Sequence, residues 1–151
     1  MKAVLQRVRS ASVVINGAQT RSIGPGLLIL LGVSDTDSVE MCEKLAQKCA
    51  GLRIFSDANG NLNLSAEDNG YEALVVPNFT LYGDTRKGKR PSFIRAAKPP
   101  LSVDCYNTFV QKLRDTRLAG VMTGEFGADM QVSLVNDGPV TIVIETDDWS
   151  R

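Results

Sequence analysis

The chain has 151 residues, 43% of them hydrophobic, and its 17 basic and 17 acidic residues give a formal net charge of zero. This length predicts one domain, residues 1–151, with a core that needs no disulfide or metal to hold it. Since the chain contains no histidine, a Ser-His-Asp or Cys-His nucleophile is excluded, and proton transfer must use other side chains, backbone groups, water or the substrate.

The cysteine content and the hydropathy pattern indicate a protein of the cytoplasm. Cys42, Cys49 and Cys105 are odd in number and widely spaced, so we expect small buried side chains and no disulfides. With no histidine and no close cysteine pair, we expect neither a metal nor another cofactor. No apolar run approaches the ~20 residues of a membrane span, and the first residues lack a signal-peptide pattern. We therefore expect a cytoplasmic protein without a membrane partner.

The first part of the chain combines strands with one helix. Strands are predicted over 2–9, 12–15 and 27–33, with a hairpin signal at Asn16-Gly17. From 39 to 49 apolar residues recur at helical spacing, which predicts a helix.

The middle of the chain repeats this mixture. Short strands are predicted at 52–55 and 62–64, and a longer strand at 73–81. A polar, basic and proline-bearing loop at 85–100 leads to a second helix at 102–116, which has apolar residues along one face.

Two or three further strands follow from Gly120 onward. Strands therefore outnumber helices, and several hairpins are short. The pattern predicts an α+β fold: a curved antiparallel or mixed, barrel-like β-sheet covered by two α-helices.

Gly138-Pro139 lies between two β-type runs, 130–135 and 140–146. Proline has no N–H for a sheet ladder, so it belongs at an edge, bulge or turn. An X-Pro bond can also adopt the cis form at a cost below ~1 kcal/mol. These residues alone favour a hairpin turn; the alternative is a cis pair whose two carbonyls point the same way and accept hydrogen bonds from an ammonium group.

A second proline, Pro77, interrupts the strand predicted at 73–81. This segment is therefore expected at a sheet edge. There the backbone N–H groups of Phe79 and Thr80 can face a ligand and stabilise an oxyanion. The Thr80 hydroxyl has no histidine to activate it, so we do not expect it to act as a nucleophile.

Two further segments carry side chains that suit a ligand. Six cations fall within residues 86–98 with no acid among them: Arg86, Lys87, Lys89, Arg90, Arg95 and Lys98. They form either a local phosphate-binding patch or a solvated loop. Phe126 and Met130 either line a pocket for a flat ring or pack in the core.

Taken together, these motifs resemble the D-aminoacyl-tRNA deacylases, formerly D-tyrosyl-tRNA deacylases. The matching segments span nearly the whole chain: residues 1–8, 79–82, 87–93, 123–124, 126–130 and 136–141. Members of this family are homodimers that hydrolyse the ester between a D-amino acid, or glycine, and the terminal adenosine of tRNA. The resemblance implies this proofreading activity here, on D-aminoacyl-tRNA and on glycyl-tRNA mischarged on tRNA-Ala.

The resemblance also implies roles for individual residues. It implies a cis Gly138-Pro139 bond that reaches into the partner subunit's site, where its carbonyls bind the α-ammonium group and exclude an L side chain. It implies that Arg7 braces this pair. By the same resemblance, the N–H groups of Phe79 and Thr80 stabilise the oxyanion, the 2′-hydroxyl of the terminal ribose assists the attacking water, and the adenine is held by two further side chains, Phe126 and Met130.

Pro77-Asn78 departs from the family pattern, which has Ser-Gln before Phe-Thr. A chirally relaxed animal relative also has proline at the first position, with a trans Gly-Pro bond, but it lacks the phenylalanine that is Phe79 here. The leading hypothesis is therefore a D-selective deacylase. The alternatives are a chirally relaxed deacylase, a tRNA 3′-end binding module without turnover, and a purely structural dimerising domain whose Gly-Pro turn is only a turn.

Overall fold

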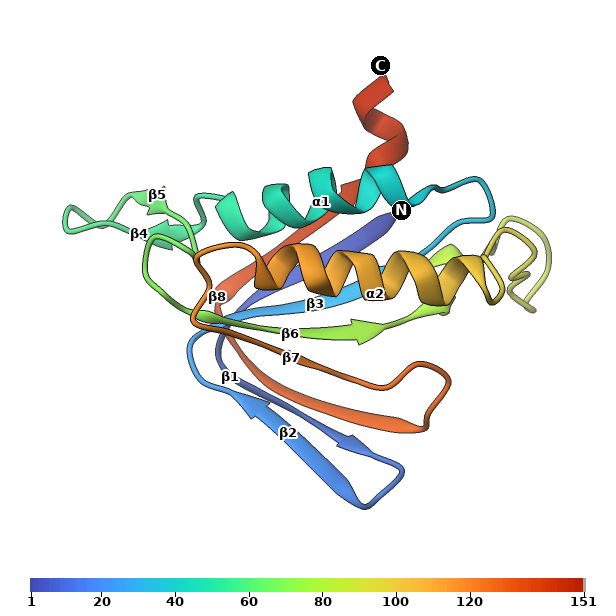
Figure 1. Cartoon of the computed structure of the whole chain (residues 1–151), viewed down its shortest axis with the longest axis horizontal. Helices are drawn as coiled ribbons and strands as arrows, with labels where there is room; N and C mark the ends of the chain where they lie inside the picture. Colours follow the sequence, from blue (N-terminus) through green and yellow to red (C-terminus); the bar gives the residue numbers. More distant parts are fainter. Residues whose placement is uncertain (151) are drawn as a thin grey trace.

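The computed structural model describes residues 1–150 of the chain (Figure 1). The helices are α1 (Val39–Gly51) and α2 (Leu101–Arg114), and the 3₁₀-helices are η1 (Phe79–Tyr82) and η2 (Thr146–Ser150). The strands are β1 (Lys2–Ile15), β2 (Gln19–Ile23), β3 (Gly26–Gly32), β4 (Phe55–Ser56), β5 (Leu62–Leu64), β6 (Glu72–Pro77), β7 (Gly120–Thr123) and β8 (Met130–Glu145).

One mixed sheet dominates the structure. Its strand order is β2-β1-β3-β6-β7, and β8 pairs with β1. The β3–β6 and β6–β7 pairs are parallel, whereas β1 pairs in antiparallel fashion with β2, β3 and β8. The first half of β1 pairs with β3 and the second half with β2, so the long strand carries the sheet through a bend. Figure 1 shows the resulting open half-barrel, with α1 and α2 over one face. The predicted fold class is confirmed.

Two cores form because the inner strands bury both faces. Neighbouring residues of a strand point to opposite sides. Leu27 and Ile29 accordingly join the larger core beneath the helices, with Leu45 of α1 and Phe109 of α2. Leu28, between them, packs in the smaller core inside the half-barrel. The continuous apolar run of β3 follows from this burial on both faces.

The Gly-Pro segment is not a hairpin turn, so that interpretation is wrong. β8 runs without a break from Met130 to Glu145, and β1 pairs with it on both sides of Gly138-Pro139. The register shifts between Gln6 and Val8, and again between Val8 and Ser10. Such irregularities mark a bulge, which lets a strand contain a residue that cannot donate to the ladder.

The strand predicted at 73–81 is also shorter than expected. β6 ends at Pro77, and residues 79–82 form a 3₁₀-helix instead. β6 is moreover an inner strand, so the prediction of a sheet edge is wrong for the strand as a whole. β7 pairs with it only as far as Val75, however, so among residues 1–150 Pro77 has one neighbouring strand, β3.

The two helices lie where the sequence predicts them, whereas two predictions of strands differ from the structure. The strands predicted at 2–9 and 12–15 form one continuous strand. Of the segment predicted at 52–55, Phe55 alone pairs with another strand among residues 1–150.

Trp149 is partly buried against the larger core, with the Lys44 ammonium 4.9 Å from its ring centre. Within residues 1–150, no helix is long and apolar enough to cross a membrane.

All three cysteines are free and buried, as the sequence predicts: Cys42, Cys49 and Cys105. Burial raises the pKa of all three thiols, that of Cys42 to about 12. The thiolate is the reactive form of cysteine. At neutral pH these side chains therefore behave as small hydrophobic residues.

We expect a thiol-reactive chromogenic reagent at about pH 8 to leave the native protein unmodified, because the thiols are both inaccessible and protonated. Unfolding in guanidinium chloride should expose all three. The absorbance of the released chromophore, measured before and after unfolding, gives the number of reactive thiols per chain. Fast stoichiometric reaction of any thiol in the native protein would contradict the described burial.

Candidate functional site

The chain leaves β6 at Pro77 and turns directly into η1. Within this turn the Leu81 amide donates to the Asn78 carbonyl at 3.4 Å, and the Gly83 amide to the Thr80 carbonyl at 2.9 Å. The amides of Phe79 and Thr80 precede the first of these bonds, as expected for residues that open a helix. Neither amide has an acceptor within residues 1–150, and both residues are exposed. The junction therefore presents two adjacent N–H groups to a ligand.

The Thr80 hydroxyl is already engaged. It donates a hydrogen bond to the side-chain oxygen of Asn78, two residues earlier. An amide oxygen is a poor proton acceptor for activating a nucleophile, and no histidine exists in the chain. This contact orients the Thr80 side chain without raising its nucleophilicity.

Two hollows meet at the β6–η1 junction. The larger, of about 440 Å³, lies beside the smaller core inside the half-barrel and is lined in part by Pro77, Asn78 and Met130. The narrower one is lined in part by Pro77, Asn78, Phe79 and Phe126. The fold thus gathers five of the residues singled out in the sequence around one junction, from β6, η1, β8 and the loop before β8.

The loop between β7 and β8 is held by contacts that the sequence did not suggest. Arg21, from β2, donates to the Thr123 carbonyl at 2.8 Å, to the Thr123 hydroxyl at 3.0 Å and to the Gly124 carbonyl at 3.3 Å. Gly124 is buried, and a Cβ there would lie 2.6 Å from the Met130 sulfur and 3.3 Å from Pro77. Only glycine therefore lets this loop pack against the end of β6.

The Gly138-Pro139 segment projects from the bulge between β8 and β1. Its peptide bond is cis, and both residues are exposed. The Arg7 guanidinium donates to the Asp137 carbonyl at 2.7 Å and to the Ile54 carbonyl at 2.8 Å. No donor to the carbonyls of Gly138 or Pro139 is found within residues 1–150.

Asn136 closes the same segment from the other side and was missed in the sequence. Its side-chain oxygen accepts a hydrogen bond from the Val140 amide at 2.8 Å, and its side-chain nitrogen donates to the Val140 carbonyl at 3.3 Å. Asparagine commonly makes such local bonds in turns. The sequence Asn-Asp-Gly-Pro at 136–139 contains this signal, but the same residues are also typical of a hairpin turn.

Within one chain, the carbonyls of Gly138-Pro139 (the carbonyl pair) lie far from the amides of Phe79 and Thr80 (the amide pair). Gly138 lies beside Arg7, which is level with Leu27 and Ala73, four rows before Pro77. At about 3.3 Å per residue this is roughly 13 Å along the strands, and the three strand spacings from β8 to β6 add about 14 Å across the sheet.

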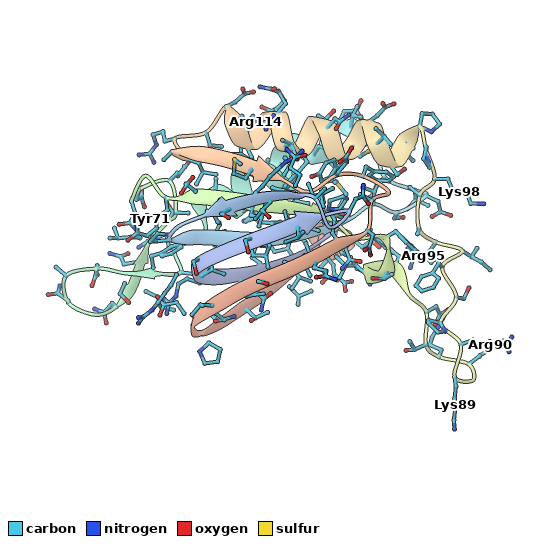
Figure 2. All side chains as sticks on the ribbon, turned by 90° about the horizontal axis from the view of Figure 1, so that it is seen from below. Tyr71, Lys89, Arg90, Arg95, Lys98 and Arg114 are labelled. Carbon is cyan, nitrogen blue, oxygen red and sulfur yellow. The ribbon has the colours of Figure 1, made fainter. Side chains whose placement is uncertain are left out.

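The basic loop lies at the far end of the molecule from the bulge. Arg86 forms an ion pair with Asp84 at 2.6 Å, and its hydrogen bonds hold the pKa of that carboxyl at about 2. Figure 2 shows Lys89 and Arg90 extended from the tip of the loop. Neither of these two forms an ion pair with any of residues 1–150. The same residues contain no group of three or more His, Cys, Asp or Glu side chains that could hold a metal ion.

Comparison with solved structures defines the class of fold. The chain resembles the c-Myc DNA Unwinding Element Binding Protein with a TM-score of 0.89 and 42% identity, over 96% of this chain and 98% of that one. A structure described as a probable eukaryotic D-amino acid tRNA deacylase has the same fold, with a TM-score of 0.84 at 18% identity over 95% of this chain and 97% of that one.

Sequence comparison then gives the family. A model of the D-Tyr-tRNA(Tyr) deacylase family matches residues 4–145. The D-aminoacyl-tRNA deacylase of Chloroflexus aurantiacus is 57% identical over 97% of this chain and 91% of its own length. That of Akkermansia muciniphila is 51% identical over 97% of both chains. The chain belongs to the D-Tyr-tRNA(Tyr) deacylase family, and the resemblance found in the sequence is confirmed.

We expect Arg7→Gln to lower the free energy of unfolding by about 1–3 kcal/mol, because the carbonyls of Asp137 and Ile54 lose a charged donor. Arg9→Gln is the matched control. Its side chain is 74% exposed and lies 3.5 Å from the same Asp137, so it should cost less than about 0.5 kcal/mol. Urea unfolding of both variants measures the difference. Equal losses would show that Arg7 does not brace the bulge.

Proposed function

We propose that the protein hydrolyses the ester bond of D-aminoacyl-tRNA and of glycyl-tRNA, releasing the amino acid and the tRNA, and that it spares L-aminoacyl-tRNA. We expect this proofreading activity in the cytoplasm. Family membership and the names of relatives more than 50% identical support the reaction. The structural observation that carries it is the pair of exposed N–H groups at Phe79 and Thr80, together with the unsatisfied carbonyls of Gly138 and Pro139.

The N–H pair fits the charge that develops during ester hydrolysis. Attack of water on the ester carbonyl places negative charge on its oxygen, and preorganised backbone donors stabilise this charge. The amides of Phe79 and Thr80 are adjacent, lie at the start of η1 and have no acceptor within residues 1–150. They supply this stabilisation without a titratable side chain.

The carbonyl pair fits the opposite charge on the substrate. An α-ammonium group donates up to three hydrogen bonds, and two carbonyls held side by side satisfy two of them. With the ammonium and the ester carbonyl both fixed, the configuration at Cα decides where the side chain points. A D side chain points out of the site, and glycine has no side chain to accommodate. An L side chain would collide with the Gly138-Pro139 backbone.

The two pairs act together only if two chains contribute. Within one chain they are separated by roughly 13 Å along the sheet and about 14 Å across it. A homodimer in which Gly138-Pro139 of one protomer enters the site of its partner removes this separation. The exposure of both residues and the hollow beside Asn78 support such an arrangement.

The remaining groups of the site position the nucleotide. Phe126 and Met130 lie on either side of the Pro77-Asn78 turn and offer apolar surface to the terminal adenine. The chain has no histidine to act as a general base, and we assign assistance of the attacking water to the 2′-hydroxyl of the terminal ribose. An aminoacyl ester is already reactive, and positioning and charge stabilisation lower the remaining barrier.

Deacylation of matched D-tyrosyl-, L-tyrosyl- and glycyl-tRNA tests the proposal. We expect the purified protein to release the D-amino acid and glycine quickly and to leave the L ester at its spontaneous rate. Hydrolysis of the L ester as well would indicate a chirally relaxed deacylase. Salt-sensitive tRNA binding without hydrolysis of any ester would indicate a 3′-end binding module instead.

We expect Thr80→Ala to keep activity within about tenfold of the unchanged protein, because only the backbone at this position acts. Gly138→Ala should lose about 100-fold, since its Cβ would lie 2.8 Å from the Val140 amide nitrogen at a φ of +148° and displace the carbonyl pair. Gly51→Ala, at the end of α1, serves as control, because no atom of residues 1–150 outside its own helix and chain neighbours would lie within 4 Å of the added Cβ. Abolition of activity by Thr80→Ala with folding intact would make the hydroxyl a participant.

A further inference from the structure

A separate hollow of about 390 Å³ lies between α2 and the loop that follows β7. Asn107, Gln111 and Arg114 line it from α2, and Glu125 and Phe126 line it from the loop. Phe126 also borders the narrow hollow that contains Phe79 and Asn78. The two spaces therefore share one aromatic wall.

The groups around this hollow are those that bind a nucleotide. Arg114 uses one N–H in a 3.3 Å hydrogen bond to the Val121 carbonyl, which leaves most of its guanidinium donors for a phosphate. The Phe126 ring is 38% exposed and packs at 6.3 Å, centre to centre, against Tyr106, so it is a supported surface for base stacking.

Further polar groups are placed to contact the edge of a base. The Asn107 side chain is exposed and has no hydrogen-bond partner within residues 1–150. Its amide can both donate to and accept from a base edge. Glu125 adds one carboxylate, which is a suitable acceptor for the exocyclic amino group of cytosine.

Two arginines, Arg21 and Arg114, lie near Tyr106 at this hollow. Burial raises the pKa of the Tyr106 hydroxyl, and the nearby guanidinium groups of Arg21 and Arg114 partly oppose that rise. Arg21 also holds the loop that carries Phe126 through its bonds to Thr123 and Gly124. The hollow thus has a fixed wall, a cationic end and a size that suits a single nucleotide.

We propose that this hollow binds the nucleotide preceding the terminal adenosine of tRNA, with its phosphate at Arg114 and its base between Phe126 and Asn107. The proposal rests on the proposed function, which places the terminal adenine against the other side of Phe126. Single-stranded RNA ends suit such a site, because their unstacked bases are free to stack on aromatic side chains.

Arg114 is distinct from the basic loop. Figure 2 shows it at the opposite end of α2 from Lys98, with Lys89 and Arg90 further out on the loop. Because Arg114 and the basic loop lie at opposite ends of α2, a single nucleotide next to the adenosine can contact one of them but not both. The proposal assigns it to Arg114.

The test compares D-tyrosyl esters of adenosine and of the dinucleotide CpA, each hydrolysed by the full-length protein. We expect kcat/KM for the dinucleotide to exceed that for the adenosine ester by about tenfold, the effect of one charged hydrogen bond. Arg114→Gln should remove this ratio, and Arg114→Lys should retain part of it. With D-tyrosyl-tRNA, log(kcat/KM) should decrease with log salt concentration. This negative slope should be shallower by about 0.7 in Arg114→Gln, the value for the loss of one phosphate contact on a single strand.

Lys112→Gln is the matched control, because Lys112 pairs with Glu43 of α1 at 3.3 Å and does not line the hollow. It should leave the dinucleotide ratio unchanged. If Arg114→Gln folds poorly, Asn107→Ala replaces it and should lower the same ratio. A ratio near one in the unchanged protein, or a ratio that Arg90→Gln lowers and Arg114→Gln does not, would overturn the proposal.

Binding of unacylated CpA and of adenosine can be measured by NMR, from chemical-shift changes of the aromatic rings. This measurement tests the subsite independently of the proposed deacylase activity. Tighter binding of CpA that depends on Arg114 supports the subsite even if no ester is hydrolysed. Hydrolysis of both esters with equal CpA and adenosine binding supports the deacylase and contradicts the subsite.

Discussion

The structure depends on one interruption in an otherwise continuous pairing of β1 with β8. These two strands run together from Lys2–Glu145 to Ile15–Met130, and their register shifts on both sides of Val8, next to the contact between Arg7 and Asp137. There a guanidinium replaces backbone donors, and the freed segment projects Gly138 and Pro139 into solvent. The strand pairing on both sides makes the projection rigid. A surface loop of the same sequence would pay the ordering entropy again on each binding event.

The second half of the site follows the same physical principle. β6 continues past its last pair with β7 at Val75 and ends at Pro77, and the first two amides of η1 have no acceptor within residues 1–150. Backbone groups on fixed elements need no proton to be gained or lost, which agrees with a chain that has no histidine. Activity of this kind depends on placement to within fractions of an ångström. In the proposed function, the contacts of Arg7, Arg21 and Asn136 that hold the backbone are therefore as important as the groups proposed to face the substrate.

The layered fold could be predicted because local patterns determine it. The helical spacing of α1 and α2 and the apolar run of β3 reflect burial that each segment undergoes wherever its partners lie. The continuity of β8 could not be predicted, because it depends on β1, more than a hundred residues away in sequence. Gly-Pro between two β-type runs is locally indistinguishable from a turn.

The site residues divide in the same way. Phe79, Thr80, Phe126 and Met130 stand out in the sequence as groups of a type that ligands use. The bracing role of Arg7 is implied only by the family resemblance. No sequence pattern indicates the role of Arg21, since an arginine in a strand usually faces solvent. Their partners are carbonyl oxygens, at Asp137, Thr123 and Gly124, which carry no signature in the sequence.

The most direct test of the central claim is a crystal structure of the protein with an amide-linked D-tyrosyl adenosine, which cannot be hydrolysed as an ester. We expect the ammonium group to bind the Gly138 and Pro139 carbonyls of one protomer, and the amide carbonyl of the ligand to accept from the Phe79 and Thr80 amides of its partner. An ammonium group bound by a side-chain carboxylate, with the ligand carbonyl away from η1, would contradict it.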